Sequence, residues 1–339
     1  MKKQKTILLV LFMAMGFCSA SAQDITATER GEIIDKVVDQ LANQYVDPNL
    51  GQKAAETIKQ KKEKQAYEAL DSKASLMKTL VADMHAATGD KQLQLKNPSG
   101  SGTEWIHPAL TFKIADGTQM DDKLKKSILQ MINYGFPAQV QEGNIGYLCV
   151  LEFYSPEIAP GVYQVIDKNM KSFQKCTAMI LDLRQCSRGG DPDVMMYLAG
   201  YFLGSEESQP LYVSFNRENQ KIAEFRTRTD IAGKRMPNVP VYILVGSETF
   251  STGEMFAYGL QKEGRAQVIG EASAGAAHVT DTVDIGHGIM MVLPVNRLAH
   301  VKTKTNWEGT GVVPDISVKA DDALAKAKEI IQEAKSNKK

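Results

Sequence analysis

A serine between a predicted strand and a predicted helix is the first candidate for chemistry. Residues 241–260 read VYILVGSETFSTGEMFAYGL, an apolar run that leads through a short polar turn into a helix beginning at Ser251. A hydroxyl at such a turn faces an open cleft, and the free amides of the first helical turn can stabilise an oxyanion. Ser251 and Glu254 also match the S-x-x-E pattern of a capping box. On this pattern alone the cap is the favoured interpretation, since a nucleophile also needs a base.

Other catalytic classes do not fit the residues. A G-x-S-x-G elbow needs a glycine two residues before the serine and another two residues after it. Here Gly253 follows Ser251, but Thr249 stands at the position before it. The cysteines after the first 22 residues, Cys149, Cys176 and Cys186, form no C-x-x-C pair, and no His/Cys/Asp/Glu cluster has metal-ligand spacing. We therefore predict neither a metal nor a cofactor.

The elements that must position Ser251 alternate between strands and helices. Strands are expected at 145–153, 176–183, 211–215, 222–227 and 239–245 and from 266 to about 301, and helices at 161–173, 192–202, 251–262 and 321–339. The run CTAMILDL at 176–183 is almost continuously apolar, as in a strand buried on both faces. The alternation predicts an α/β layered domain over 140–320, followed by a surface helix over 321–339.

The first part of the chain has a helical pattern. Apolar residues recur at spacings of three and four between 26 and 88, and the turn-rich segment at 97–102 interrupts the pattern. A strand-like segment at 110–114 and a short helix over 121–134 follow. We predict a small N-terminal helical domain over 24–115.

The first 22 residues have the features of a secretory signal peptide. Three lysines precede an apolar run of about 11 residues, and Ala20-Ser21-Ala22 offers a cleavage site. The run is too short to cross a bilayer, which needs roughly 20 residues. Cys18 suggests a lipid-anchored cysteine, but the bulky Phe17 before it does not fit such a signal. Export to the periplasm or the medium, with cleavage after Ala22, is the prediction, and no stable membrane insertion is expected afterwards.

Charge excludes one class of partner. The chain has 40 basic and 40 acidic side chains, and removing the three lysines of residues 1–22 leaves 37 basic against 40 acidic. A net charge near −3 gives no electrostatic footprint for nucleic acid or an anionic membrane. The oligomeric state is left open.

Four segments, taken in order, resemble the tail-specific (C-terminal-processing) serine peptidases. They are MILDLRQCSRGG at 179–190, the T-x-S-x-x-E pattern around Ser251, GRAQVIGEASAGAAH at 264–278 and NWEGTGVVPD at 306–315. The branch they resemble is the one shared with interphotoreceptor retinoid-binding protein and the tricorn core peptidase. No PDZ-like insertion is evident in the sequence.

The resemblance implies a layered β/α peptidase core of the ClpP/crotonase-like type behind a small N-terminal helical domain. It implies that Ser251 is the nucleophile. It also implies that the backbone at Ser251 and Thr252 supplies one oxyanion donor and that Gly189 or Gly190 supplies the other.

The general base is where this sequence departs from the family pattern. Many members use a lysine in the loop after "GE", and Ala276 stands there instead. The other branch uses a histidine in a D-x-H segment, with a later glutamate. Glu308 matches that glutamate, but Gln92 replaces the histidine. A glutamine can orient a substrate but cannot accept a proton near neutral pH.

The remaining histidines offer substitutes for the missing base. His278 is nearest in the motif series, and it serves either as the base or as a structural hydrogen-bonding residue. His107 precedes a proline and is a second candidate to face the cleft. His85 ends an amphipathic helix and reads as a surface or hinge residue.

The glycine loop departs from the family pattern as well. Residues 185–188, Gln-Cys-Ser-Arg, precede the glycine pair where relatives carry an asparagine and further glycines. Arg188 either narrows the cleft or binds a substrate carboxylate through a bidentate contact. Asp182 and Arg184 are expected to hold this loop rather than to act in chemistry.

Two functions follow from these residues. The first is an exported serine-type peptidase that cleaves a polypeptide substrate with Ser251, with Glu308 orienting the base. The second is a non-catalytic module that kept the fold, lost the base at Gln92 and Ala276, and binds peptides or apolar ligands.

Overall fold

The computed structural model describes residues 25–97, 135–203 and 207–336. The predicted signal peptide, the strand-like segment at 110–114, the helix at 121–134 and His107 lie outside these residues. No helix within the described ranges is long and apolar enough to span a membrane.

Three helices form the N-terminal part of the structure, within the range that the sequence predicted to be helical. They are α1 (Ala27–Gln44), α2 (Pro48–Glu63) and α3 (Lys73–Thr88). The side chains of Thr26, Asp47 and Ser72 accept amide hydrogen bonds at the three N-termini, as capping residues do. Gly89 ends α3 in the left-handed conformation, with φ 74°. The chain therefore turns sharply just before Asp90 and Gln92.

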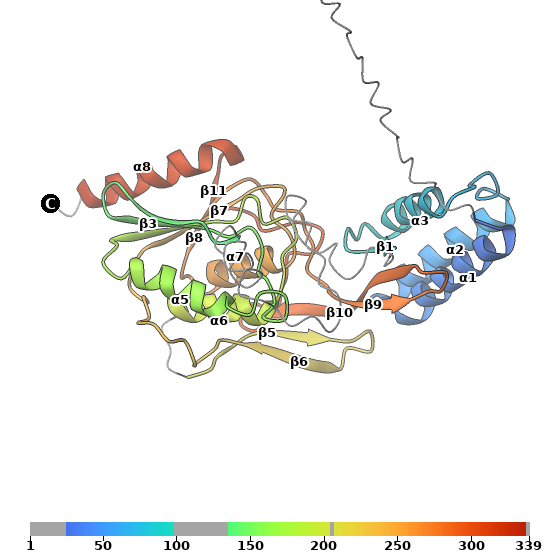
Figure 1. Cartoon of the computed structure of the whole chain (residues 1–339), viewed down its shortest axis with the longest axis horizontal. Coiled ribbons are helices and arrows are strands. Elements are labelled where there is room, and N and C mark those ends of the chain that lie inside the picture. Colours follow the sequence, from blue (N-terminus) through green and yellow to red (C-terminus); the bar gives the residue numbers. More distant parts are fainter. Residues whose placement is uncertain (1–24, 98–134, 204–206, 337–339) are drawn as a thin grey trace, which may run out of the picture.

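A hairpin from the C-terminal half completes this helical part. Strands β9 (Val279–Asp284) and β10 (Met290–His300) are antiparallel, and β1 (Gln94–Lys96) pairs with β10. The apolar faces of the helices pack on apolar residues of the hairpin and its turn, which include Ile285, Ile289, Met291 and Leu293. Figure 1 shows the helices and the hairpin together as one lobe.

A six-stranded sheet forms the centre of the second lobe. Its order is β11-β8-β7-β4-β3-β2, and every neighbouring pair is parallel except β2 and β3. The strands are β2 (Ala138–Gln141), β3 (Ile145–Cys149), β4 (Ala178–Asp182), β7 (Val241–Val245), β8 (Gln267–Gly270) and β11 (Ile316–Ser317). All residues of β4 and β7 are buried, as their apolar runs predicted.

Helices cover both faces of this sheet (Figure 1). On one face lie α5 (Val162–Ser172), α6 (Pro192–Leu203) and α7 (Thr252–Lys262), packed on alternate residues of β4 and β7 such as Leu181 and Ile243. On the other face, after a 3₁₀ turn at Ala320–Asp322, lies α8 (Ala323–Ser336). The predicted surface helix thus buries one side, with Ala327 and Ile331, against the sheet.

One long strand joins the two lobes. The second half of β10 pairs with β5 (Pro210–Phe215), which forms the predicted hairpin with β6 (Lys221–Arg226). The register of β10 shifts between Pro294 and Asn296, where pairing with β9 ends. The predicted α/β layered core with N-terminal helices is confirmed, although β3 ends at Cys149 rather than at Phe153.

Candidate active site

Ser251 lies on a sharp turn between β7 and α7. Its backbone has φ 49° and ψ −115°, a conformation that a residue with a side chain rarely adopts. The buried Thr249 holds the turn, since its hydroxyl donates to the carbonyl of Leu183 (2.8 Å) and accepts from the amide of Gly246 (3.1 Å). An ordinary N-cap residue is extended. Ser251 has instead the strained strand-to-helix geometry of a nucleophile elbow.

The carboxylate half of the predicted capping box is present and does more than cap. Glu254 is fully buried and accepts the amide of Ser251 at 2.9 Å. It also accepts the Ser273 hydroxyl (2.6 Å) and the amides of Gly275 (2.6 Å) and Ala276 (2.9 Å). Burial raises the pKa of the Glu254 carboxyl, and these four donors oppose the rise. Glu254 therefore ties the serine turn to the loop that carries Ala276 and His278.

The glycine pair lies directly beside the serine turn. Gly189 has φ 70°, and a Cβ added to it would stand 2.7 Å from the Thr252 amide and 2.9 Å from the Ser251 Cβ. Gly190 has φ 116°, and a Cβ there would stand 2.2 Å from the carbonyl oxygen of Phe153. Only glycine fits these two positions without strain. The Thr252 hydroxyl donates to the Gly190 carbonyl at 2.7 Å and fastens the loop to α7.

Three backbone amides at this junction are available as hydrogen-bond donors. Within the part of the chain that the structure describes, the amides of Gly189, Gly190 and Thr252 donate to no protein acceptor. Gly189 and Thr252 are buried and Gly190 is exposed. Buried amides are normally paired, so the unpaired amides of Gly189 and Thr252 beside a strained serine can stabilise an anion.

In the DLR segment, Asp182 accepts the side chain of Arg184 at 2.7 and 2.9 Å, and Arg184 also donates to the Ala320 carbonyl at 2.7 Å. That these two residues hold the glycine loop stays a prediction.

Among the described residues, His278 is the one histidine that lines a cavity with Ser251. Its Nδ1 lies 2.8 Å from Oδ2 of Asp90 and 3.7 Å from Oε2 of Glu308. The same Asp90 oxygen accepts the hydroxyl of Tyr45 at 2.9 Å, and Asp90 is 2% exposed. A carboxylate at Nδ1 fixes the ring tautomer and leaves Nε2 as the proton acceptor.

The charges around this ring shift three pKa values. Burial lowers the pKa of His278, but the Asp90 hydrogen bond and the Glu308 and Asp90 charges outweigh it, so that the pKa lies above its ordinary value. For Asp90, burial raises the pKa, and the hydrogen bond and charge of His278 outweigh it and lower the pKa. Burial raises the pKa of Glu308, although the His278 charge opposes the rise. These contacts stabilise the charged form of the His278 imidazole relative to a free histidine.

The side chain of Gln92 is hydrogen-bonded to the backbone of His278. Its Nε2 donates to the His278 carbonyl at 2.9 Å, and its Oε1 accepts the His278 amide at 2.8 Å. A glutamine that uses both side-chain atoms in this way fixes the main chain and has little left to offer a substrate. It also joins the helical lobe to the loop at 273–278.

The loop around Ala276 is clamped from two sides, and Ala276 itself offers Ser251 no proton acceptor. The Ala276 carbonyl accepts the indole of Trp307 at 3.1 Å, and the Gly275 carbonyl accepts the Gly309 amide at 2.9 Å. Glu308 accepts the amide of Ala277 at 2.6 Å. The loop at 273–278 and the NWEGTGVVPD segment are therefore neighbours, and together they hold Glu308 near His278.

Two cavities meet at Ser251. One, of about 260 Å³, is lined by Ser251, Gly190, Thr252 and His278 together with apolar side chains. The other, of about 670 Å³, is lined by Ser251, Gly190 and Arg188 together with further charged and polar side chains and the apolar Phe153, Ile158, Phe250 and Val292. The serine thus stands at the junction of two hollows, each lined by both polar and apolar side chains.

The larger cavity holds several charged groups. Arg188, Glu152 and Lys96 all line it. Burial raises the pKa of Glu152 to about 7, and the Arg188 charge opposes the rise. Burial and the Arg188 charge together lower the pKa of Lys96. The sequence-predicted Arg188 therefore lies in the cleft, beside Ser251.

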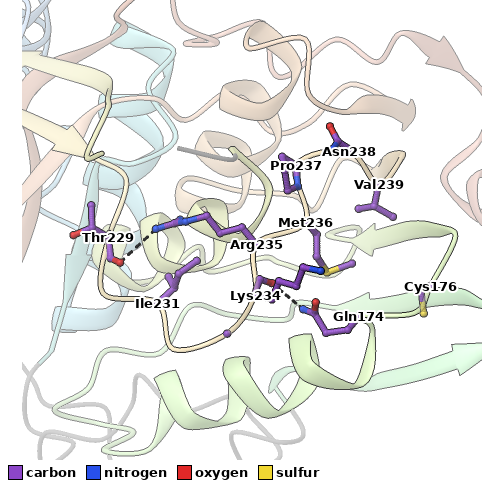
Figure 2. A pocket seen from close by; sticks show the side chains of 11 residues that line it. Gln174, Cys176, Thr229, Ile231, Lys234, Arg235, Met236, Pro237, Asn238 and Val239 are labelled. Carbon is purple, nitrogen blue, oxygen red and sulfur yellow. Dashed lines mark hydrogen bonds between the residues drawn. The ribbon is translucent and has the colours of Figure 1, made fainter. Parts of the chain in front are cut away.

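A third hollow, of about 810 Å³, lies away from this site. Residues of the 229–239 loop line it together with Gln174 and Cys176. Figure 2 shows the hydrogen bond that the Arg235 guanidinium donates to the Thr229 carbonyl. It shares no lining residue with the two cavities at Ser251. We assign it no part in the chemistry of the site.

Asp90, His278 and Glu308 are also the set that could hold a metal ion. One ligand atom from each lies within 4.8 Å of the others. The sequence spacing did not reveal this cluster, because Asp90 is far from the other two in the chain. Nδ1 of His278 already bonds Asp90, so a cation would have to displace that hydrogen bond.

Two other residues of reactive types, His85 and Cys186, have different surroundings. The His85 ring bonds the Leu93 carbonyl at 2.7 Å, within the helical lobe. Cys186 is buried, and burial raises the pKa of its thiol, so it is an inert core residue. The sequence predicted neither the contact of Asp90 with His278 nor the four hydrogen bonds that Glu254 accepts. The D-x-Q segment was a visible signal for Asp90, since Asp90 stands two residues before Gln92.

Comparison with known proteins gives family matches over both lobes. The model of peptidase family S41 matches residues 144–318, and the model for the N-terminal domain of Peptidase_S41 in eukaryotic IRBP matches residues 20–132. A carboxy-terminal-processing protease of Bartonella bacilliformis is 27% identical over 180 residues. The match covers 52% of this chain and 39% of that relative.

Solved structures show the same fold at low identity. A lipoprotein from Streptococcus agalactiae superposes with a TM-score of 0.58 at 12% identity, over 90% of this chain and 96% of that one. The photosystem II D1 C-terminal processing protease gives 0.52 at 14% identity, over 88% and 94%. The tricorn protease gives 0.51 at 12% identity, over 88% of this chain and 35% of that one. The resemblance expected from the four segments is confirmed.

Proposed function

Because the chain belongs to peptidase family S41, we propose that it is a serine-type peptidase that hydrolyses peptide bonds in polypeptides. Ser251 is the nucleophile. The observation that carries the proposal is a serine at φ 49° beside three amides without protein acceptors among the described residues. Strain and unpaired donors are costly to the fold, and a site for an oxyanion accounts for both.

His278 is the general base in this proposal. Its Nδ1–H donates to Asp90, so Nε2 accepts the Ser251 proton as Oγ attacks the substrate carbonyl carbon. The proton then passes to the leaving amine, and water releases the acyl group by the reverse sequence. No hydrogen bond joins Ser251 to the imidazole among the described residues. Such bonds are often long in the absence of substrate, and both residues line the same cavity.

The tetrahedral intermediate carries its negative charge on the former carbonyl oxygen. Gly189 or Gly190 and Thr252 provide the amides that stabilise it. The positive charge that forms on His278 is stabilised by Asp90 and, at 3.7 Å, by Glu308. Gln92 orients the His278 backbone and thereby replaces, in a supporting role only, the histidine that relatives carry there.

Substrate binding is assigned to the larger cavity. Arg188 lies there with Lys96, and a guanidinium can bind a carboxylate of the polypeptide through two hydrogen bonds. We further propose that the protein is exported and acts in the periplasm or outside the cell. The charged and apolar pattern of residues 1–22 supports export.

A second function, a non-catalytic module for peptides or apolar ligands, is favoured by two observations. Both family positions for a base are occupied by residues that cannot accept a proton, Gln92 and Ala276. Gln92 is moreover fixed by two hydrogen bonds, so a histidine placed there would lose them. This module would keep the cavities and lack turnover.

Covalent labelling separates the two functions. The purified chain from Gln23 onward is treated with a fluorophosphonate, which phosphonylates only activated serines, and the labelled peptide is found by mass spectrometry. The peptidase predicts one adduct, on Ser251, that is absent from Ser251→Ala. A wild-type protein with an intact fold and no adduct after long exposure would support the non-catalytic module.

Replacing Gly189 with alanine should lower kcat/KM about 10²–10³-fold, the loss typical of an oxyanion donor. The new Cβ would stand 2.7 Å from the Thr252 amide and 2.9 Å from the Ser251 Cβ, so it must displace one of them. Gly264→Ala is the matched control, because Gly264 also has a positive φ, 66°, but nothing lies within 4 Å of its Cβ position. Equal activity losses in the two variants would mean that backbone strain alone explains the effect.

A further inference from the structure

Asp90, His278 and Glu308 form the one group of histidine, cysteine and acidic side chains, among the described residues, that is compact enough to hold a metal ion. We propose that they bind a divalent transition-metal cation of the Zn²⁺ type, and that the bound ion switches the peptidase off reversibly. The metal site follows from the geometry of the three side chains alone. The inhibition rests on the proposed function, in which His278 is the general base.

The three ligand atoms are already close to the spacing of a zinc site. Nδ1 of His278 lies 2.8 Å from Oδ2 of Asp90 and 3.7 Å from Oε2 of Glu308, and one ligand atom from each residue lies within 4.8 Å of the others. In a tetrahedral site, bonds of about 2.0–2.2 Å place neighbouring ligand atoms about 3.3–3.6 Å apart. Side-chain shifts of about 1 Å therefore bring all three atoms onto one ion.

The donor atoms select the class of cation. One imidazole nitrogen and two carboxylate oxygens suit Zn²⁺, which often has three protein ligands and a water in the fourth position. Ca²⁺ and Mg²⁺ prefer sites made of oxygen alone. The two carboxylates also balance the charge of a divalent ion, and Asp47 adds a negative charge near the His278 ring.

Neighbouring groups hold both carboxylates in place. The Tyr45 hydroxyl donates to Oδ2 of Asp90 at 2.9 Å, and the Gln92 amide donates to Oδ1 of the same residue at 2.8 Å. The Ala277 amide donates to Oε2 of Glu308 at 2.6 Å. Hydrogen bonds of this kind orient the carboxylates that ligate metals, so the site has the supporting contacts that a metal centre needs.

The site is shielded from water and still has an entrance. The side chains of Asp90 and His278 are 2% and 11% exposed, whereas that of Glu308 is 22% exposed. Shielding from water strengthens the attraction between a cation and the carboxylates. Glu308 therefore marks the side from which an ion reaches the two deeper ligands.

A metal ion on Nδ1 leaves His278 unable to act as the base. In the metal-free chain Nδ1–H donates to Asp90, and Nε2 has the free lone pair. When Nδ1 gives its lone pair to the cation, the one proton of the neutral ring must be on Nε2, which then cannot accept the Ser251 proton. A ring that carries two protons first releases one to water. Only coordinate bonds and this proton shift are involved, so a chelator restores the enzyme.

Calorimetry measures metal binding without any need for activity. ZnCl₂ is titrated into the metal-free chain from Gln23 onward, after removal of any affinity tag. Glu308→Gln and Asp90→Asn each remove a ligand, so each should weaken Kd by at least the roughly 10–100-fold that loss of a supporting residue costs. Circular dichroism identifies a variant that does not fold, and the other variant then decides the result.

The matched control is His287→Gln. His287 also lies beside two carboxylates, 2.7 Å from Glu32 and 3.6 Å from Glu29, but it lies in the turn between β9 and β10, away from the cavities at Ser251. This variant should bind Zn²⁺ with the wild-type Kd at the proposed site. If the measured site were lost in His287→Gln and kept in the other two variants, the proposal would be overturned.

X-ray absorption at the zinc edge identifies the ligands in the wild-type chain, so this arm depends on no variant. One imidazole nitrogen with oxygen donors, at about 2.0–2.2 Å, is the expected result. Sulfur ligands, several imidazoles, or no heat of binding at millimolar ZnCl₂ would overturn the metal site.

Hydrolysis of a peptide tests the inhibition separately. As Zn²⁺ fills the site, kcat/KM should fall about 10²-fold or more, the loss expected when a general base is taken away. EDTA should restore the activity, and the same concentrations of MgCl₂ should have no effect. Binding at the three ligands with unchanged hydrolysis would overturn the inhibition and leave the metal site standing. If the metal-free chain cuts no peptide, the proposed function fails, and calorimetry and X-ray absorption still decide the metal site.

Discussion

Replacing His278 with glutamine should lower kcat/KM about 10²–10⁴-fold, the range typical of a positioned general base. The ring is the one imidazole that lines a cavity with Ser251 among the described residues, and Asp90 fixes its tautomer. Glutamine keeps a similar size but cannot accept the serine proton. Steady-state hydrolysis of a peptide that the wild-type chain cleaves gives the ratio.

The matched control is His85→Gln. The His85 ring is bonded to the Leu93 carbonyl within the helical lobe, so its loss affects local structure but not proton transfer. Activity should remain near the wild-type value in this control. If His278→Gln also kept full activity while Ser251 remained essential, the base would have to be sought elsewhere.

The pH profile of the same reaction tests the mechanism independently. A protonated His278 cannot accept a proton, so kcat/KM should rise with pH and level off above the pKa of this ring. Asp90 and Glu308 hold that pKa above its ordinary value of 6.5, and the rising limb should therefore lie at higher pH than an unperturbed histidine would give. Asp90→Asn removes the bonded charge and should move this limb to lower pH, besides slowing the reaction. A purely structural Asp90 would leave the limb where it is.

The strongest sequence signals were local, and they located the serine turn well. The apolar run 241–245, the polar turn and the helix that follows it form the strand, turn and helix around Ser251. The glycines at 189 and 190 were expected beside Ser251 from family resemblance, and a Cβ on Gly189 would collide with the Ser251 turn. Motifs of this kind are readable because each fits within a dozen residues.

The backbone geometry of Ser251 could not be read from its sequence. The S-x-x-E pattern describes an extended N-cap and an elbow equally, and only φ 49° distinguishes them. Propensity favours the cap because strain costs free energy. Glu254 shows the same limit, since three of its four donors come from residues 273–276, about 20 positions later in the chain.

The base site depends on contacts between distant parts of the chain. Asp90 and His278 are 188 residues apart, and a sequence pattern gives no account of their meeting. They meet because β1 pairs with β10, which brings the end of the helical lobe to the loop before β9. The sequence predicted an N-terminal helical domain, but not that a hairpin from the C-terminal half completes its core.

The most direct measurement is cleavage of an unfolded protein by the chain from Gln23 onward, with Ser251→Ala in parallel. Removing the nucleophile of a serine peptidase costs about 10⁶-fold in kcat, so the variant should produce no fragments in the time that the wild type digests the substrate. Circular dichroism and thermal unfolding establish that both proteins are folded. Fragments from the wild type alone are the predicted result. Equal cleavage by both proteins, or none by a folded wild type over a long incubation, would contradict a working nucleophile at Ser251.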